Sequence, residues 1–300
     1  MHDGQLTVTL DTVRALIADQ FPQWAHEPVA ALAASGTVNA VFRVGDRLAA
    51  RFPLVVDDEA TTRRLLQAEA DAARDLASAT SVATPVVLAL GEPGHGYPGP
   101  WCVTSWVDGS PLTPDGFALS TPLALDIAGL IRELRAAPVG ARVFSGSGRG
   151  GDLRAHDEWM RTCLANSAGL LDVEALARAW ATFRLLPRRS PDVMSHTDLI
   201  PANLLVSGGR LCGVLDVGGF APADAALDLV VAWHAFDGQA RQALRDALGS
   251  DDLEWKRGAA WAFEQAMGLV WYYRESNPAM AELGRSTLER VTASGIAETR

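Results

Sequence analysis

The sequence predicts an α+β protein with a small β-rich N-terminal part and a larger, mostly helical C-terminal part. Short apolar runs with strand-like spacing are concentrated before residue 108, whereas nearly every segment after residue 226 has the 3.6-residue spacing of a helix. The chain has 300 residues, of which 48% are hydrophobic and 21% are charged. This composition is enough to bury a large core and argues against a disordered or fibrous chain.

The N-terminal part alternates helical and strand-like patterns. We expect first a helix that has Asp11 as its N-cap and ends before Pro22, and then a hairpin of the runs 41–44 and 48–52 around Gly45-Asp46-Arg47. A second helix is expected over 58–78, with Leu65, Leu66, Ala72, Ala73 and Leu76 on one side. Strands are expected at 85–90 and 101–107. A hinge is expected near 105–109, which divides the chain into residues 1–107 and 108–300.

The C-terminal part is expected to be helical around one short hairpin. We expect helices over 123–134 and 173–183, with a Gly/Ser/Arg loop over 140–151 between them. A hairpin of the runs 204–206 and 211–215 around Gly208-Gly209 is expected next. From 226 onward we expect helices, with Pro278 between the last two. Two lobes joined by one crossing segment are expected to form a ligand site between them.

Charge and cysteine content exclude several classes of function. The net charge of −10 argues against a nucleic-acid partner and an anionic membrane, and is compatible with a cationic small molecule. Three cysteines without a paired spacing exclude a disulfide framework or a cysteine zinc site. No signal peptide and no long apolar run are evident, so we expect a cytoplasmic protein. Nothing in the pattern indicates an oligomeric state.

The stretch from Ser195 to Val206 carries the most informative motif. His196, Asp198 and Asn203 follow the spacing H-x-D-x-x-x-x-N, and Asp216 ends the apolar run that comes next. Phosphoryl transfer requires one carboxylate that orients a hydroxyl and accepts its proton, and an amide oxygen and a second carboxylate that hold Mg²⁺ against phosphates. Residues of this kind on loops that flank a rigid hairpin predict such a site, although the same residues also occur as ordinary turn and capping residues.

This stretch resembles the catalytic loop of the aminoglycoside phosphotransferase family, which has a protein-kinase-like, two-lobed fold. Members of the family read H-G-D-x-x-x-x-N and then I-D-F/W, followed by D-P-x-x-D-L-A. The resemblance implies that Asp198 is the catalytic base, that His196 braces the loop, and that Asn203 and Asp216 bind Mg²⁺. It also implies that ATP, with GTP as the alternative, is the phosphoryl donor.

Two further acids and three departures from the family pattern complete the comparison. Asp228 is expected to support the catalytic loop, and Asp224 stands at the D-P position as a supporting or substrate-binding acid. Thr197, Val217 and Ala225 replace the usual glycine, aromatic residue and proline. Since threonine tolerates positive φ poorly, Thr197 predicts that the loop has negative φ at this position. None of the three departures removes an oxygen that the chemistry needs.

The N-terminal part is expected to bind the nucleotide. Between two predicted strands, Gly36, Thr37 and Asn39 belong to a turn whose backbone amides can cover the β- and γ-phosphates. Kinases pair a strand lysine with a helix glutamate, but the only lysine of this chain is Lys256. The resemblance therefore assigns the phosphate contact to Arg51 and its partner to Glu69.

The hinge and the acceptor pocket complete the expected site. In this fold the adenine edge meets the hinge backbone, which the alignment of motifs places at Ser105, Trp106 and Val107. Glu264 lies within an apolar helical run, where a carboxylate either faces a cleft or marks the wet side of the helix. The first of these alternatives would make Glu264 a contact for the phosphate acceptor. Aromatic residues of the same region are expected mainly in the core.

The expected activity is phosphoryl transfer to a hydroxyl of a small molecule, most simply an aminoglycoside-type antibiotic. The same loop also serves related kinases for macrolides, peptide antibiotics, choline, homoserine or sugars, because a fold does not specify a substrate. A non-catalytic nucleotide-binding scaffold on this fold is a second interpretation, favoured by Arg51, Thr197 and Val217. A protein-substrate kinase is a weaker one, because no conventional activation-loop signature follows Asp216.

Overall fold

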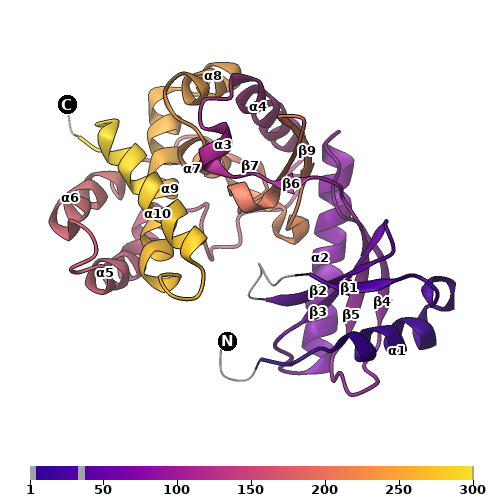
Figure 1. Cartoon of the computed structure of the whole chain (residues 1–300). Helices are drawn as coiled ribbons and strands as arrows, with labels where there is room; N and C mark the ends of the chain where they lie inside the picture. Colours follow the sequence, from indigo (N-terminus) through magenta and orange to yellow (C-terminus); the bar gives the residue numbers. More distant parts are fainter. Residues whose placement is uncertain (1–4, 33–37, 299–300) are drawn as a thin grey trace. The chain divides into compact units, whose positions relative to one another are not determined.

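The computed structural model of the chain describes residues 5–32 and 38–298. The chain divides by its internal contacts into two compact units of an α+β fold (Figure 1). The first unit comprises residues 1–78, 83–108 and 217–219, and the second comprises residues 79–82, 109–216 and 220–300. Residues 79–82 thus belong to the second unit and residues 217–219 to the first, although the residues on both sides of each segment belong to the other unit.

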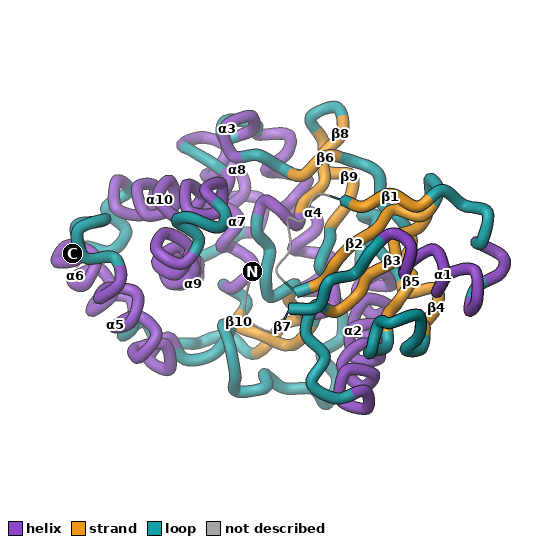
Figure 2. Tube along the Cα trace, turned by 60° about the horizontal axis from the view of Figure 1, so that its bottom comes forward, coloured by secondary structure: helices purple, strands orange, loops and turns teal. Residues whose placement is uncertain are grey.

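A five-stranded antiparallel sheet forms the centre of the first unit, with the strand order β1-β2-β3-β5-β4 (Figure 2). The strands are β1 (Val29–Ala31), β2 (Asn39–Val44), β3 (Leu48–Pro53), β4 (Val87–Gly91) and β5 (Trp101–Ser105). Val44 pairs with Leu48, which confirms the tight hairpin expected around residues 45–47. Gly45 has a φ of 57°, which glycine adopts without a Cβ clash.

Two helices cover opposite faces of this sheet. Helix α1 (Leu10–Gln20) packs on a core that includes Phe52 and Trp101, which face it from the sheet. Because side chains alternate along a strand, Arg51 points to the other face. That face is covered by α2 (Glu59–Ala79).

Two expectations for these helices are wrong in detail. The N-cap of α1 is Thr9, whose hydroxyl accepts a hydrogen bond from the backbone N–H of Thr12 at 3.2 Å, and Asp11 is the second residue of the first turn. On α2, Leu65 is 60% exposed, whereas Leu66 is buried. The spacing of Leu66, Ala73 and Leu76 sets the buried side of this helix, and Leu65 lies about 100° away from it.

Helices dominate the second unit. They are α3 (Pro114–Phe117), α4 (Thr121–Ala136), α5 (Asp157–Asn166), α6 (Val173–Phe183), α7 (Val230–Ala235), α8 (Gly238–Leu248), α9 (Asp252–Tyr272) and α10 (Pro278–Ala293). Helix α9 is buried along most of its length and packs beside α10, as Figure 1 shows. A residue on α9 therefore reaches the interior from every side of the helix, which matters for the site described below.

Two small sheets frame the loops of the second unit. Strand β7 (Asp192–Ser195) pairs antiparallel with β10 (Ala221–Asp224), and β8 (Leu204–Ser207) lies between β6 (Ser110–Pro111) and β9 (Arg210–Val214). The β8–β9 hairpin confirms the expectation for the turn at Gly208-Gly209. Strands β7 and β10 have four residues each, too few for their alternation to be recognised in the sequence.

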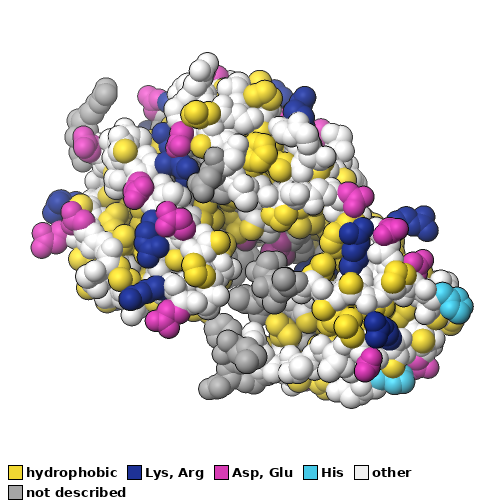
Figure 3. Space-filling view, in the orientation of Figure 1, with side chains coloured by type: hydrophobic (Ala, Val, Ile, Leu, Met, Phe, Trp, Pro, Cys, Tyr) yellow, Lys and Arg dark blue, Asp and Glu magenta, His cyan; other side chains and the backbone are white. Residues whose placement is uncertain are grey.

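Within the described residues, no helix combines the length and the apolar character that crossing a membrane requires. Figure 3 shows arginine side chains beside aspartates and glutamates on the drawn face of each unit. Several ion pairs of the described residues join side chains one helical turn apart, such as Arg74 with Asp71 and Arg161 with Glu158. Positive charge on this face is thus interspersed with negative charge.

Candidate active site

The loop between β7 and β8 holds Asp198 and Asn203, and a buried carboxylate fixes its first residues. Asp228 is 2% exposed and accepts hydrogen bonds from the hydroxyl of Ser195 at 2.8 Å and from the backbone N–H of His196 at 3.1 Å. A buried carboxylate with two donors is a rigid anchor. Asp228 thus makes the contacts expected of an acid that supports the catalytic loop.

His196 connects this loop to the segment that carries Asp216. Its ring is fully buried, and its Nε2 donates to the backbone oxygen of Leu215 at 2.8 Å. The backbone N–H of Leu215 donates in turn to the backbone oxygen of Asn203 at 2.7 Å. The residue before Asp216 is therefore bonded to both ends of the H-x-D-x-x-x-x-N motif.

The backbone is strained at one residue of this loop and at one residue after β9. Thr197 has a φ of 71°, so the expectation of negative φ at this residue is wrong. Its N–H donates to the hydroxyl of Ser195 at 3.0 Å, a contact that is part of the turn. Asp216 has a φ of 55°, which aspartate tolerates better than a β-branched residue does. Strain of this kind concentrates at functional sites.

The carboxylate of Asp198 is held asymmetrically. Its Oδ1 accepts a hydrogen bond from Nη2 of Arg149 at 2.8 Å and another from Nε2 of Gln265 at 2.8 Å. Its Oδ2 accepts, among the described residues, only a long contact of 3.4 Å from Nδ2 of Asn203. One carboxylate oxygen is thus occupied by two good donors, and the other is left largely open.

Two further buried side chains orient Gln265. The Gln265 oxygen lies 3.0 Å from Nε2 of His234, and Nδ1 of His234 lies 2.8 Å from the hydroxyl of Thr287 on α10. Burial lowers the pKa of His234 to about 4, so the ring is neutral at physiological pH. The Asp198 carboxylate only accepts hydrogen bonds, so the Gln265 amide nitrogen faces Asp198 and the Gln265 oxygen faces His234. The proton of the neutral His234 ring is therefore on Nε2, and this contact keeps Gln265 in that orientation.

Asn203 and Asp216 provide oxygen ligands that suit Mg²⁺. Asn203 donates its amide N–H groups to the backbone oxygen and the carboxylate of Asp198, at 2.9 and 3.4 Å, which leaves its amide oxygen for a cation. The described residues contain no group of three or more His, Cys, Asp or Glu side chains that could hold a metal. One amide and one carboxylate nevertheless fit Mg²⁺, because this ion keeps waters and phosphate oxygens as its other ligands.

Glu264 is buried on α9 at 2% exposure, so it does not mark a wet side of the helix. Its Oε1 lies 2.8 Å from Nδ1 of His156, and Nε2 of His156 lies 3.2 Å from the backbone oxygen of Gly148. Both neighbours only accept hydrogen bonds, so both ring nitrogens donate. The Glu264 carboxylate accordingly raises the pKa of His156 above its ordinary value. The acceptor contact expected of Glu264 stays a prediction.

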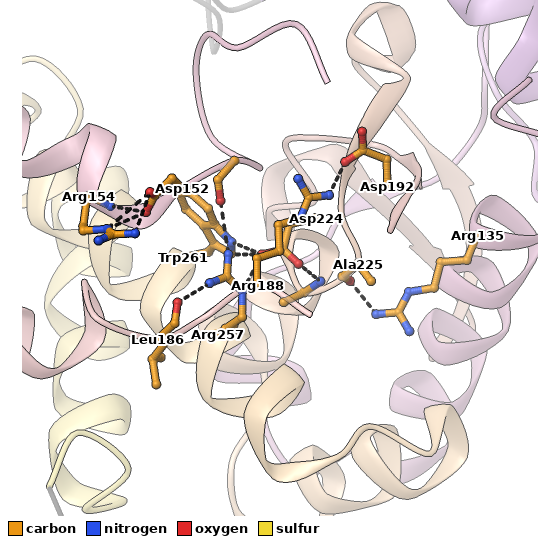
Figure 4. A network of polar contacts seen from close by, with 12 residues as sticks. Arg135, Asp152, Arg154, Leu186, Arg188, Asp192, Asp224, Ala225, Arg257 and Trp261 are labelled. Atoms are coloured by element: carbon orange, nitrogen blue, oxygen red, sulfur yellow. Dashed lines mark hydrogen bonds and ion pairs between the residues drawn. The ribbon is translucent and has the colours of Figure 1, made fainter. Parts of the chain in front are cut away.

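Asp224 forms a buried ion pair, shown in Figure 4. Its Oδ2 accepts from Nε of Arg257 at 2.8 Å and from Nε1 of Trp261 at 3.0 Å, and its Oδ1 accepts from the N–H of Ala226 at 3.2 Å. Both oxygens are thereby satisfied, and the residue is 3% exposed. The substrate contact expected of Asp224 stays a prediction without an open oxygen to support it.

The expected nucleotide residues of the first unit lie on its sheet and on α2. Arg51 lies on β3, where it pairs with Cys102 of β5. Burial raises the pKa of the Cys102 thiol to about 11, with Arg51 lowering it and Glu69 raising it further. The charges of Arg51 and Glu69 thus both affect the Cys102 thiol, while a direct contact between Arg51 and Glu69 stays a prediction. Asn39 begins β2, and Gly36 and Thr37 lie outside the described residues.

The hinge segment is already bonded to the sheet on one side. The N–H of Ser105 donates to the backbone oxygen of Val86, and the N–H of Trp106 donates to that of Arg47 at 2.7 Å. The guanidinium of Arg43 lies 4.5 Å from the centre of the Trp106 ring. The N–H groups of Ser105 and Trp106 are thus already used within the first unit, and the adenine contact of this segment stays a prediction.

Each unit has a hollow that lies mostly away from these residues. One, of about 510 Å³, is lined in the first unit by Trp24, Glu27, Val44, Asp46, Arg47, Leu48, Leu88 and Ser105. It includes Ser105 but neither Arg51 nor Glu69. A concave shape is therefore a weaker guide here than the hydrogen bonds of the catalytic loop.

A catalytic-loop aspartate, an amide and a second carboxylate on a protein-kinase-like fold define the class of phosphoryl-transfer enzymes. The chain belongs to the phosphotransferase enzyme family, whose profile matches residues 29–263. Among curated proteins, the sequence comparison finds no match.

Solved structures of similar fold are phosphotransferases. The GDP and kanamycin complex of APH(2")-IIia is 22% identical, with 94% of this chain and 98% of that chain covered and a TM-score of 0.71. The ADP-bound aminoglycoside phosphotransferase APH(2'')-Ib is 16% identical, with 95% and 99% covered and a TM-score of 0.62. The macrolide 2'-phosphotransferase MphH from Brachybacterium faecium is 18% identical, with 93% and 98% covered and a TM-score of 0.62. At these identities the likeness is one of fold.

Sequence reasoning missed three residues that surround Asp198. In the sequence, Arg149 looks like any arginine of a polar loop, and Gln265 and His234 look like single polar residues in apolar helical stretches. Gln265 carried one available signal, because a polar residue directly beside Glu264 in a buried run needs a partner. Nothing local to Arg149 or His234 indicated their positions, since their partners lie 49 and 31 residues away.

Proposed function

We propose that the protein transfers the γ-phosphoryl group of ATP, with GTP as the alternative donor, to a hydroxyl of a small molecule. Asp198 accepts the proton of that hydroxyl while its oxygen attacks the γ-phosphorus. The bond from the γ-phosphorus to the β–γ bridging oxygen breaks, and the nucleoside diphosphate leaves with the electron pair. In this proposal the reaction takes place in the cytoplasm, where nucleotide and Mg²⁺ are supplied.

The observation that carries the proposal is the bonded arrangement of the two loops. Leu215 links the loop of Asp198 and Asn203 to Asp216, because its backbone oxygen accepts from the His196 ring and its N–H donates to the backbone oxygen of Asn203. Asn203 and Asp216 would hold Mg²⁺, which when bound neutralises charge on the phosphates. Arg51, supported by Glu69, would contact the phosphates, and the backbone amides of Gly36, Thr37 and Asn39 would contact them as well. Ser105, Trp106 and Val107 would meet the adenine.

An aminoglycoside-type acceptor is the first choice. Structures of similar fold include complexes whose names give kanamycin, gentamicin and streptomycin. The net charge of −10 favours approach of a polycation. Glu264 and Asp224 are the acids proposed earlier for such a contact, although each is now paired inside the second unit.

Macrolide-type acceptors are the second choice, because two macrolide 2'-phosphotransferases also share the fold. Peptide antibiotics, choline, homoserine and sugars belong to the same test. A non-catalytic nucleotide-binding scaffold is the alternative from another class. The complete set of Asp198, Asn203 and Asp216 favours the enzyme, because a scaffold does not need a proton acceptor.

The test is nucleoside diphosphate release from Mg-ATP and from Mg-GTP against a panel of these acceptors. The blank is Asp198→Asn, which keeps the size of the side chain and removes the carboxylate. A second variant, Asp216→Ala, is examined for the thermal shift that Mg-ATP gives the wild type.

The outcomes separate the hypotheses. Acceptor-dependent release in the wild type that disappears in Asp198→Asn establishes the phosphotransferase and identifies its acceptor class. A Mg-ATP shift that is lost in Asp216→Ala, without turnover on any acceptor, favours the scaffold. No nucleotide shift at all contradicts the proposed roles of Arg51, Asn203 and Asp216.

A further inference from the structure

We propose that Arg149 and Gln265 are positioning residues that hold Oδ1 of Asp198, so that Oδ2 is the oxygen that receives the acceptor proton. The inference rests on the proposed function and adds which oxygen reacts and what aims it. Both donors lie 2.8 Å from Oδ1. A carboxylate oxygen that accepts two good hydrogen bonds, one of them charge-assisted, is a poorer proton acceptor than its open neighbour.

The loop that carries Arg149 is built to present this residue. It stands between Gly148 and Gly150, whose φ angles are 71° and 108°. A Cβ at Gly150 would lie 2.7 Å from the Cβ of Ala223, so only glycine lets the loop approach β10 this closely. Within residues 145–151, Arg149 is the one long side chain, and the backbone on both sides of it has a conformation that favours glycine.

Three backbone oxygens around Arg149 are tied to side chains or strands. His156 donates to Gly148 at 3.2 Å, the N–H of Asp224 donates to Gly150 at 2.8 Å, and Arg257 donates to Gly151 at 3.1 Å. Each of these three partners is anchored elsewhere in the second unit. The guanidinium thus approaches Asp198 from a fixed backbone, as a positioning role requires.

Helix α9 supports Asp198 from two sides through consecutive residues. Gln265 contacts Oδ1 directly and is oriented by His234. Glu264 acts at a distance, because it holds His156, which holds the backbone beside Arg149. Adjacent helix residues point about 100° apart, so one turn of a buried helix can serve both routes.

The segment from Leu199 to Ala202, which directly follows Asp198, contains no basic residue. The single lysine of the chain, Lys256, contacts the backbone oxygen of Glu298. Among the described residues, Arg149 is the only basic side chain that contacts the Asp198 carboxylate. During transfer, the hydroxyl proton passes to Oδ2 while the O–P bond forms, and Oδ1 keeps its two donors throughout. Neither positioning residue needs to move.

The experiment compares Arg149→Ala, Arg149→Lys and Gln265→Ala with the wild type, on an acceptor that the panel identifies. We expect kcat to fall about 10²-fold in Arg149→Ala with KM for the nucleotide within about twofold, as misplacement of a reacting group predicts. Arg149→Lys should recover about tenfold, since lysine keeps the charge but not the planar fork. The matched control is Arg154→Ala, an arginine five residues further on, whose ion-pair partner among the described residues is the exposed Asp152.

Chemical rescue distinguishes positioning from a general structural effect. Guanidinium ion at non-denaturing concentration should restore part of the kcat of Arg149→Ala, and sodium at equal ionic strength should not. The double variant Arg149→Ala/Gln265→Ala should lose much less than the product of the single losses, because both act on one oxygen. A wild-type or higher kcat in Arg149→Ala, or a loss confined to KM, overturns the proposal.

A double-mutant cycle on stability is read without any turnover. It combines Arg149→Ala with Asp198→Asn and compares urea unfolding midpoints. Additive midpoint changes would mean that the two side chains do not interact, and this overturns the inference whatever the acceptor. Coupled changes in a protein that transfers no phosphoryl group would leave the contact intact and contradict the proposed function alone.

Discussion

Two arginine–aspartate pairs in the second unit make the same kind of bond in opposite settings. The pair of Asp224 and Arg257 is almost fully buried, with side-chain exposures of 4% and 3%. The pair of Asp198 and Arg149 is open, with exposures of 33% and 29%. In the first pair both carboxylate oxygens are satisfied, whereas in the second one oxygen is left nearly open.

This difference shows how a fold separates a structural charge pair from a functional one. A saturated, buried pair contributes to stability chiefly because removal of one partner leaves an uncompensated charge in the interior. A partly exposed pair contributes less to stability, on the order of 0.2 to 1 kcal/mol, since water screens it. The open pair can therefore change with a small effect on folding, and the buried pair can change with a small effect on chemistry as long as the loop beside it stays in place.

The largest effect is expected for the carboxylate of the open pair. Asp198→Asn should reduce acceptor-dependent turnover about 10³-fold, because general base catalysis contributes on that order. Its thermal midpoint should stay within a few degrees of the wild type. Steady-state kinetics and thermal unfolding of the same preparation check both statements. Retained turnover would mean that Asp198 is not the proton acceptor.

The buried pair gives the reverse result. Arg257→Met should lower the free energy of unfolding by about 3 to 5 kcal/mol, because Asp224 then stays buried without its cation. Figure 4 shows that the same guanidinium also binds the backbone oxygen of Leu186 at 2.7 Å. Urea unfolding of Arg257→Met and of Arg149→Met, the matched change in the open pair, should differ by several-fold in midpoint shift. Equal shifts would contradict the comparison.

The open pair was only half predictable from the sequence. Asp198, Asn203 and Asp216 follow from spacing, because the motif is local and its residues are chemically distinctive. Arg149 and Gln265 reach Asp198 across 49 and 67 residues, and only the tertiary fold brings them together. The buried pair was equally hidden, since Asp224 and Arg257 are 33 residues apart.

The fold itself was more predictable where elements are long. The β2–β3 hairpin, α2, α4 and α6 were recognised because apolar periodicity extends over many residues. Strands β7 and β10 were missed because four residues show no clear alternation. The expectation for Thr197 failed because residue type gives only a preference for φ, and the bonds of the loop override it.

A titrating contact lies beside the open pair and should make the stability of the protein depend on pH. His156 lies beside Glu264 with a raised pKa, and it holds the backbone next to Arg149. A histidine with a raised pKa in the folded state contributes stability that is fully present below its unfolded pKa. That stability is lost as pH rises through the folded pKa.

The pH effect is expected to be moderate. Between pH 6 and pH 9, the wild type should lose about 1 kcal/mol more than His156→Gln, because a neutral ring can no longer donate to both Glu264 and Gly148. Urea unfolding at both pH values makes the comparison. His95→Gln is the control, a histidine that is 42% exposed and 3.4 Å from Asp19. A pH dependence that is identical in wild type and His156→Gln would remove the ring from this role.

The smallest effect concerns the backbone on which the open pair stands. Asp224 lies in a regular strand, but Asp198 follows Thr197, a β-branched residue with a φ of 71°. Thr197→Gly should therefore raise the free energy of unfolding by about 0.5 kcal/mol, since left-handed backbone costs threonine about 1 to 2 kcal/mol and the greater freedom of glycine in the unfolded chain offsets part of that gain. The control Thr162→Gly, on helix α5, should instead lower it by a similar amount because glycine destabilises a helix. If Thr197→Gly is also destabilising, contacts of the threonine side chain outweigh the backbone strain, and the strain then gives no stability difference between the two pairs.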